Sequence, residues 1–236
     1  MVFAAIFAGG SGSRMGTDIP KQYLMLGTKP VIVHTAEAFV NYKSLDHVFI
    51  LCPADRVDYT RQLIDEHIPG NDINVIEGGK TRNDTLINAI KYIYDNFPVD
   101  EDTVILTHDA VRPFVTARMI CDNIKAALAF GACDTVIPAT DTIVRSLDND
   151  FISEIPVRSE LYQGQTPQSF RLAELKRTVE SLTAEETELL TDACKIYSVK
   201  GKPVKLVEGA VTNMKITYKD DLVLANAILG GCDFTS

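Results

Sequence analysis

Short apolar segments rich in β-branched residues alternate along this chain with longer segments whose apolar residues recur every three or four positions. The short segments are typical of buried strands and the longer ones of amphipathic helices. Strands that alternate with helices predict a mainly parallel sheet, in an α/β, doubly wound, Rossmann-like architecture. We expect strands at 2–7, 48–51, 73–76, 104–107, 135–138 and 204–207, and helices at 30–40, 56–67, 82–94, 117–130 and 219–229.

The length suits one large α/β domain, and we expect residues 1–236 to form it. The 46% hydrophobic and 23% charged residues are ordinary for a globular protein, and no apolar run approaches the roughly 18 residues of a membrane span. The first residues enter a strand without a basic segment or a cleavage site. We therefore expect a cytoplasmic protein with no membrane partner.

The net charge of −9 argues against nucleic-acid binding, because surfaces that bind nucleic acid need an excess of Lys and Arg. Any site for a polyanion must be local. The five cysteines are scattered singly, and the four histidines form no metal-binding motif. Buried free thiols are expected, and no transition-metal site is indicated.

A glycine-rich string, FAGGSGSRMGTDIPK, begins at the end of the first expected strand. Gly9, Gly10 and Gly12 permit positive φ and a close approach of the backbone, so that N–H groups can face an anion. Arg14 and Lys21 add two cations that can neutralise phosphate oxygens. As isolated residues they would be surface charges, but after a glycine turn and a buried strand they indicate a nucleoside triphosphate site.

Two familiar glycine motifs are excluded by register. The dinucleotide fingerprint could start at 10–12, but it would need glycine where Met15 stands, and the next glycine is Gly16. The P-loop could end at 79–81, but its first glycine would fall on Asn74.

Two further loops follow expected strands. The string GGKTRNDT ends at Thr85 and either turns the chain and caps the next helix or contacts a base or ribose. The string THDAVRPF places Asp109 at a strand end and Arg112 in the following turn. Asp109 is either a turn former or a carboxylate that orients Mg²⁺ or a substrate hydroxyl, and His108 is expected to be structural. Because these loops and the glycine-rich loop follow parallel strands, we expect all three to meet in one crevice.

Lys215 lies between apolar residues in a strand-like run, which indicates an anionic partner or the outward face of an edge strand. The alternation of strands and helices stops at 139–157, which is expected to form a protruding β-arm of two short strands around a turn at 147–150. Apolar residues exposed on such an arm favour a partner subunit, so we expect a homodimer.

The strings AGGSGSRMG with IPKQY, GGKTRNDT, THDAVRPF, GQTPQSF, TDACKIY and TNMKIT together resemble the cytidylyltransferases of sugar-alcohol phosphates over nearly the whole chain. Two groups compete, the ribitol-5-phosphate enzymes of cell-wall polymer synthesis and the 2-C-methyl-D-erythritol 4-phosphate enzymes of isoprenoid synthesis. The strings IPVRSELYQGQTPQSF and LTDACKIY are closer to the ribitol group.

This resemblance implies a nucleotidyltransferase sheet, CTP and a polyol phosphate as substrates, Mg²⁺ as cofactor, and functional coupling to a reductase that forms ribitol 5-phosphate. It implies catalytic roles for Arg14, Lys21 and Lys215. It places CTP against Phe7, Ala8, Gly9, Gly10, Gly12, Gly79, Arg82, Asn83, Asp84 and Thr85. It places the acceptor against Asp109, Arg112, Thr142, Arg158 and Thr166, with Asp109 also a metal ligand and with Thr142 and Arg158 reaching across from the neighbouring subunit's arm.

Two alternatives from other classes remain at this point. A NAD-binding oxidoreductase would use the same strand ends, although the broken fingerprint argues against it. A non-catalytic nucleotide sensor would keep the fold without turnover, and the two cations of the glycine-rich segment argue against that.

Overall fold

A computed structural model describes residues 1–10, 15–16, 19–190 and 192–231. Its central sheet has the strand order β5-β4-β1-β6-β8-β7-β9. All neighbours in this sheet are parallel except that β8 runs antiparallel to both β6 and β7. The α/β, mainly parallel prediction is confirmed. The strands are β1 (Val2–Phe7), β4 (His47–Cys52), β5 (Asn74–Glu77), β6 (Val104–Asp109), β7 (Ala132–Pro138), β8 (Tyr162–Arg171) and β9 (Lys205–Glu208), and β2 (Met25–Leu26) pairs with β3 (Lys29–Pro30) in a separate hairpin.

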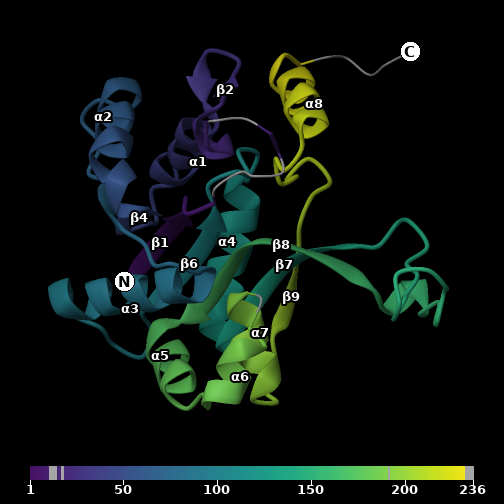
Figure 1. Ribbon diagram of the computed structural model, residues 1–236. Helices are drawn as coiled ribbons and strands as arrows, with labels where there is room; N and C mark the ends of the chain where they lie inside the picture. The colour runs from purple at the N-terminus through teal and green to yellow at the C-terminus, as the bar shows by residue number, and fades with distance from the viewer. Residues whose placement is uncertain (11–14, 17–18, 191, 232–236) are drawn as a thin grey trace.

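Helices cover both faces of the sheet (Figure 1). Alternate residues of β1 point to opposite faces, so Ala4 and Ile6 pack with α1, α2 and α4, while Phe3 and Ala5 pack with α3, α5 and α7. β1 is buried on both faces and is apolar throughout. The helices are α1 (Val31–Val40), α2 (Val57–His67), α3 (Arg82–Asn96), α4 (Ala117–Phe130), α5 (Leu172–Glu180), α6 (Ala184–Glu188), α7 (Ala193–Val199) and α8 (Lys219–Leu229), with short 3₁₀ turns η2 (Lys21–Tyr23), η3 (Ala54–Arg56) and η4 (Arg158–Glu160).

The strand β8 was not predicted, because its sequence YQGQTPQSFR is polar. In the fold its buried polar side chains find internal partners: Ser169 Oγ donates to Asn123 Oδ1 at 3.0 Å, and Gln168 Nε2 donates to Asp134 Oδ1 at 3.1 Å. Helices α5, α6 and α7 were also not predicted. The strand-like reading around Lys215 was wrong, since residues 214–217 are irregular and Ile216 N donates to Val111 O at 2.9 Å.

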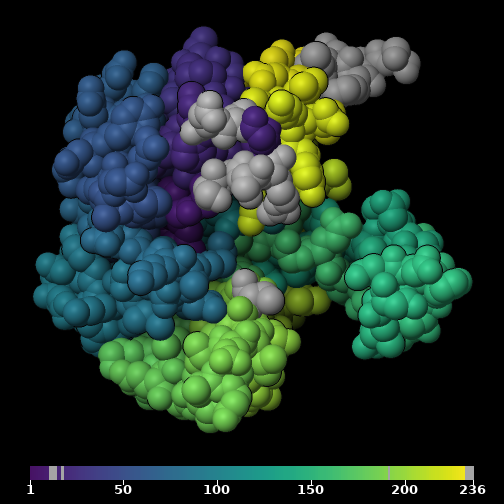
Figure 2. Space-filling model, viewed as in Figure 1, coloured from purple at the N-terminus to yellow at the C-terminus, as the bar shows by residue number. Residues whose placement is uncertain are grey.

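The predicted arm projects from the body beyond the ends of β7 and β8, and the space-filling view shows it as a separate lobe (Figure 2). The expectation of two strands in it was wrong: one isolated bridge joins Arg145 to Glu154. The turn between them forms because Asp148 Oδ1 accepts backbone hydrogen bonds from Asp150 and Phe151, each at 3.0 Å. Leu147 and Phe151 are 75% and 72% exposed, so the arm does not bury its own apolar side chains.

Within the described ranges, no helix has the length and apolar character needed to cross a membrane.

Candidate active site

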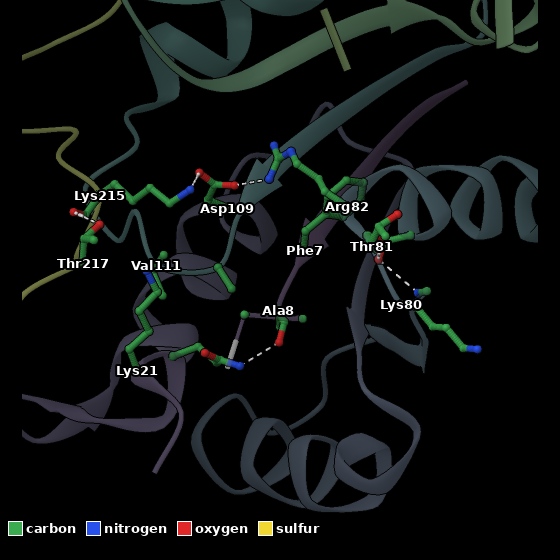
Figure 3. A pocket seen from close by; sticks show the side chains of 16 residues that line it. Phe7, Ala8, Lys21, Lys80, Thr81, Arg82, Asp109, Val111, Lys215 and Thr217 are labelled. Atoms are coloured by element: carbon green, nitrogen blue, oxygen red, sulfur yellow. Dashed lines mark hydrogen bonds and ion pairs between the residues drawn. The ribbon is translucent and has the colours of Figure 1, made fainter. Parts of the chain in front are cut away.

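A cavity of about 320 Å³ opens at the carboxyl ends of the central strands (Figure 3). The loops after β1, β5 and β6 all line it, which confirms the predicted convergence. Lys215 and Thr217, just before α8, complete the opposite wall. Of the predicted site residues, the cavity is lined by Phe7, Ala8, Gly9, Gly10, Lys21, Gly79, Arg82, Thr85, Asp109 and Lys215.

The glycines that line the cavity serve two different purposes. Gly9 and Gly10 do not adopt positive φ, so that part of the prediction was wrong. Among the described atoms, a Cβ at Gly9 would meet none within 4 Å and one at Gly10 would lie 3.9 Å from Lys21 Cε, so neither position is filled by a described neighbour. A Cβ at Gly79 would fall 2.1 Å from Asp84 Cβ, so glycine is required there for the loop to pass the start of α3.

The start of α3 is held by a capping box. Thr81 Oγ1 accepts from Asp84 N at 3.1 Å and Asp84 Oδ2 accepts from Thr81 N at 3.0 Å, so Asp84 stabilises the helix end and does not line the cavity. Thr85 Oγ1 accepts from Gly79 N at 3.0 Å and donates to Thr81 O at 2.8 Å. The Thr85 hydroxyl therefore fixes the loop that lines the cavity.

Asp109 lies at the end of β6 and is contacted by three cations. Its Oδ1 pairs with Arg82 and its Oδ2 lies 3.0 Å from Lys215 Nζ (Figure 3). Its Oδ2 also lies 3.4 Å from Arg112 Nε. The Arg82 guanidinium also lies 5.2 Å from the centre of the Phe7 ring. Burial by itself would raise the pKa of the Asp109 carboxyl, but Arg82, Lys215 and Arg112 together hold that pKa well below its ordinary value. The cluster has two positive charges more than negative ones, which suits a polyanion.

Hydrogen bonds from distant segments hold this cluster in place. Arg112 Nη1 donates to Asn213 O at 2.8 Å, and Asn213 Nδ2 donates to Thr166 O at 2.9 Å. Together with the bond from Ile216 N to Val111 O, these contacts tie the segment that carries Lys215 to the end of β6. Spacing in the sequence could not have predicted this contact.

Thr166 and His108 support Asp109 from behind. Thr166 Oγ1 accepts from Asp109 N at 3.1 Å, so its own hydrogen can donate to His108 Nδ1 at 3.0 Å, and His108 Nε2 then donates to Arg112 O at 3.0 Å. Burial lowers the pKa of His108 to about 4, so its ring is neutral near pH 7. The expectation of a structural histidine agrees with this geometry.

Several predicted site residues do not line the cavity. Arg112 and Thr166 lie behind Asp109, and Asn83 donates from Nδ2 to Leu190 O at 3.5 Å. Thr142 is on the arm, and Arg158, whose Nη1 donates to Thr140 O at 3.1 Å, is where the arm returns. The positions predicted at Gly12 and Arg14 lie outside the described residues.

Lys80 and Thr81, in the loop expected to contact CTP, also line the cavity, whereas sequence reasoning missed four further lining residues, Gln22, Ala110, Val111 and Thr217. Gln22 is the clearest case, because its buried side chain donates from Nε2 to Ala8 O at 2.7 Å and so fixes the start of the glycine-rich loop. Its position directly after Lys21 in the string IPKQY was the available signal.

The fit of a metal ion depends on Asp109, the single acidic residue among the described residues that line the cavity. Both of its oxygens already face cations, and the described part of the chain contains no group of three or more His, Cys, Asp or Glu side chains that could hold a metal. The described residues therefore form no metal site of their own. Mg²⁺ would instead be held together with the phosphate oxygens of a bound nucleotide.

Comparisons with known proteins agree with this geometry. Residues 2–231 match the family model of 2-C-methyl-D-erythritol 4-phosphate cytidylyltransferase (IspD). The chain is 47% identical over 230 residues to the ribitol-5-phosphate cytidylyltransferase of Lactiplantibacillus plantarum, which covers 97% of this chain and 98% of that protein.

Solved structures give the same result. The 2-C-methyl-D-erythritol 4-phosphate cytidylyltransferase of Francisella tularensis superimposes with a TM-score of 0.79 at 28% identity, over 95% of this chain and 98% of that one. The 4-diphosphocytidyl-2C-methyl-D-erythritol synthase of Anaerococcus prevotii gives a TM-score of 0.78 at 26% identity, over 97% and 96%. The predicted resemblance is confirmed, and the chain belongs to the IspD family of cytidylyltransferases.

Proposed function

We propose that this enzyme transfers CMP from CTP to D-ribitol 5-phosphate, giving CDP-ribitol and pyrophosphate. The main support for this proposal is the cluster of cations around Asp109, in a cavity that is also lined by Gly9 and Gly10. The 47% identity to a ribitol-5-phosphate cytidylyltransferase supports the acceptor. The proposal extends to cell-wall polymer synthesis such as that of teichoic acid, to a cytoplasmic location, and to supply of the acceptor by a reductase.

The shape of the cavity supports CTP as the nucleotide substrate. We assign the triphosphate to the side where Lys21, Arg82 and Lys215 lie, because all three cations line the cavity there and two of them, Arg82 and Lys215, pair with Asp109. The open backbone at Gly9 and Gly10 allows phosphate oxygens to approach N–H groups closely. The nucleoside then lies toward the loop that Thr85 holds against the start of α3.

The reaction needs no protein base. A phosphate monoester has a second pKa of about 6, so the acceptor is largely a dianion at neutral pH. One of its oxygens attacks the α-phosphorus of CTP, the new O–P bond forms as the bond to the bridging oxygen of the β-phosphate breaks, and pyrophosphate leaves with both electrons of that bond. Lys21 and Lys215 stabilise the developing negative charge. Mg²⁺, when bound with CTP, neutralises charge on the triphosphate.

The proposal includes a homodimer in which each arm completes the acceptor site of its partner. The apolar side chains of the arm, such as Leu147 and Phe151, are not covered by the described residues of the same chain. Arg158 and Thr142 do not line the cavity of their own chain, which is compatible with a role in the neighbouring site. Sedimentation of the purified enzyme tests this, and a Phe151→Glu change should shift it toward the monomer.

A second candidate acceptor is 2-C-methyl-D-erythritol 4-phosphate, favoured by the family model and by the solved neighbours. The test is pyrophosphate release from CTP and Mg²⁺ with each acceptor at equal concentration. A higher kcat/KM with ribitol 5-phosphate supports the proposal, and a higher kcat/KM with the other acceptor replaces it without changing the residue roles. Absence of release with either would favour a nucleotide sensor, and stabilisation by NAD(H) but not by CTP would favour an oxidoreductase.

A further inference from the structure

A second polar cluster lies beside the active-site cavity but does not line it. Asp134 is on β7 and pairs in register with Gln168 on β8. Gln168 Nε2 donates to Asp134 Oδ1 at 3.1 Å and approaches Asp192 Oδ1 at 3.5 Å. Asp192 caps α7, where its Oδ1 accepts from Lys195 N at 2.9 Å. Two carboxylates from separate elements therefore share one amide.

Gly164 connects this cluster to the cations of the active site. A Cβ at Gly164 would lie 3.6 Å from Asp134 Oδ2, and the carbonyl of Gly164 accepts from Arg112 Nη2 at 3.5 Å. Gly164 is exposed and Asp134 is half-buried, and the bare backbone at 164 touches both Arg112 and the edge of Asp134. A larger residue at 164 would bring a side chain against Asp134.

The amide between the carboxylates is not satisfied. Gln168 is 4% exposed, and its Oε1 has no hydrogen-bond partner among the described residues, although its Nε2 contacts both acids. Buried polar atoms are nearly always paired, so an unmet amide oxygen beside two acids is unusual for a cluster that serves packing alone. A ligand that brings hydroxyl donors would meet this need.

The environment of Asp134 is costly for a carboxylate. The pKa of Asp134 is raised to about 7, chiefly by burial and also by the nearby Asp192, against the opposing effects of the Gln168 hydrogen bond and of Arg112 and Arg82. A neutral apolar residue would avoid this cost. Groups whose pKa is strongly shifted by burial together with a charged neighbour are enriched at functional sites.

We propose that Asp134 is a specificity-determining residue that accepts hydrogen bonds from the hydroxyl groups of the polyol acceptor, with the Asp192 and Gln168 side chains beside it. This inference rests on the proposed function and deepens it. With the acceptor phosphate near Arg112, Arg82 and Lys215, the carbon chain extends over Gly164 and brings its hydroxyls to Asp134. Ribitol 5-phosphate has one more hydroxyl than methylerythritol phosphate and no branching methyl group, so a carboxylate here favours it.

The test is steady-state kinetics of Asp134→Asn and Asp134→Leu with both acceptors. Loss of a charged hydrogen bond to a substrate hydroxyl should lower kcat/KM for ribitol 5-phosphate by about 10-fold in the Asn variant and by about 100-fold in the Leu variant, mainly through KM. KM for CTP should stay within about 2-fold, because the cation cluster is unchanged. The preference for ribitol 5-phosphate over methylerythritol phosphate should fall in both variants.

The pH dependence supplies a second readout. For the wild type, kcat/KM for ribitol 5-phosphate should rise through the titration of Asp134 in addition to the titration of the acceptor phosphate near about 6. In the Asn variant, kcat/KM should rise with pH only through the titration of the acceptor phosphate. Asp95→Asn, an exposed change on α3, is the matched control and should leave both profiles as in wild type.

The outcomes separate the two proposals. If wild-type enzyme does not use ribitol 5-phosphate, the proposed function fails. If it does, but Asp134→Asn keeps wild-type kcat/KM and preference, this inference alone is overturned. An equal loss with both acceptors and a raised KM for CTP would also overturn it, because Asp134 would then be structural. Should the Leu variant fail to fold, the near-isosteric Asn variant decides.

Discussion

Replacing Asp109 by Asn tests whether the cationic cluster is held together by one carboxylate. The amide keeps the shape and one acceptor oxygen but leaves Arg82, Arg112 and Lys215 without a negative partner. Removing one partner of a fully buried ion pair costs about 3–5 kcal/mol. The side chains of Arg112, Arg82 and Lys215 are 10%, 26% and 40% exposed, so water compensates the last two in part.

We therefore expect a loss of about 2–4 kcal/mol in the free energy of unfolding, or roughly 5–15 °C in Tm for a chain of this size. Pyrophosphate should reduce the Tm difference between wild type and Asp109→Asn, because an anion bound among the three cations replaces the missing negative charge. Thermal unfolding with and without pyrophosphate measures both effects, with Asp95→Asn as an exposed control. A Tm within about 2 °C of wild type, or a Tm difference that pyrophosphate does not change, would refute the reasoning.

The remaining predictions concern acid stability, catalysis, the loop and the second cluster. The pKa of Asp109 is lowered in the fold, so the ionised carboxylate stabilises the folded protein above the ordinary Asp pKa of about 3.9, and this stabilisation is lost as pH falls below that value. The free energy of unfolding of Asp109→Asn should therefore fall less steeply with acid than that of wild type, as measured by unfolding at a series of pH values. Lys21→Ala and Arg14→Ala should each lower kcat by about 10²–10³ with Tm nearly unchanged, as measured by pyrophosphate release. Gly79→Ala should weaken CTP binding in calorimetry, because its Cβ overlaps Asp84. The pKa of Asp134 is raised to about 7, so the folded protein loses stability as pH rises toward and past that value. The Tm of Asp134→Asn minus the Tm of wild type should therefore be larger at pH 8 than at pH 5. An equal Tm difference at the two pH values would contradict this.

The sheet was largely predictable because hydrophobic periodicity determines it locally. The strand β1 and the helices α4 and α8 were predicted with the boundaries that the structure shows. The strand β8 was missed because its buried residues are polar, and their burial depends on partners such as Asn123 and Asp134 that no local pattern reveals. Periodicity detects apolar burial, and it fails where hydrogen bonds make polar burial possible.

The site shows the same division. The loops after β1, β5 and β6 converge as expected, because parallel strands end at one edge. The details within the loops differ: Gly9 leaves open space and does not adopt positive φ, and the Thr85 hydroxyl is used inside its own loop. These depend on atomic contacts at the start of α3, which spacing does not encode.

The Asp109 cluster also links catalysis to folding. The Asp109 carboxylate pairs with cations from three segments: the start of α3, the loop after β6 and the segment before α8. The polyanion site is therefore complete only when all three segments have folded against one another. The mutual repulsion of the cations is offset by Asp109 in the free enzyme and further by the triphosphate in the complex. The excess positive charge that binds CTP therefore lowers the stability of the ligand-free enzyme locally, even though the net charge of the whole chain is −9. Anions that fill the site should stabilise the protein in proportion to their charge.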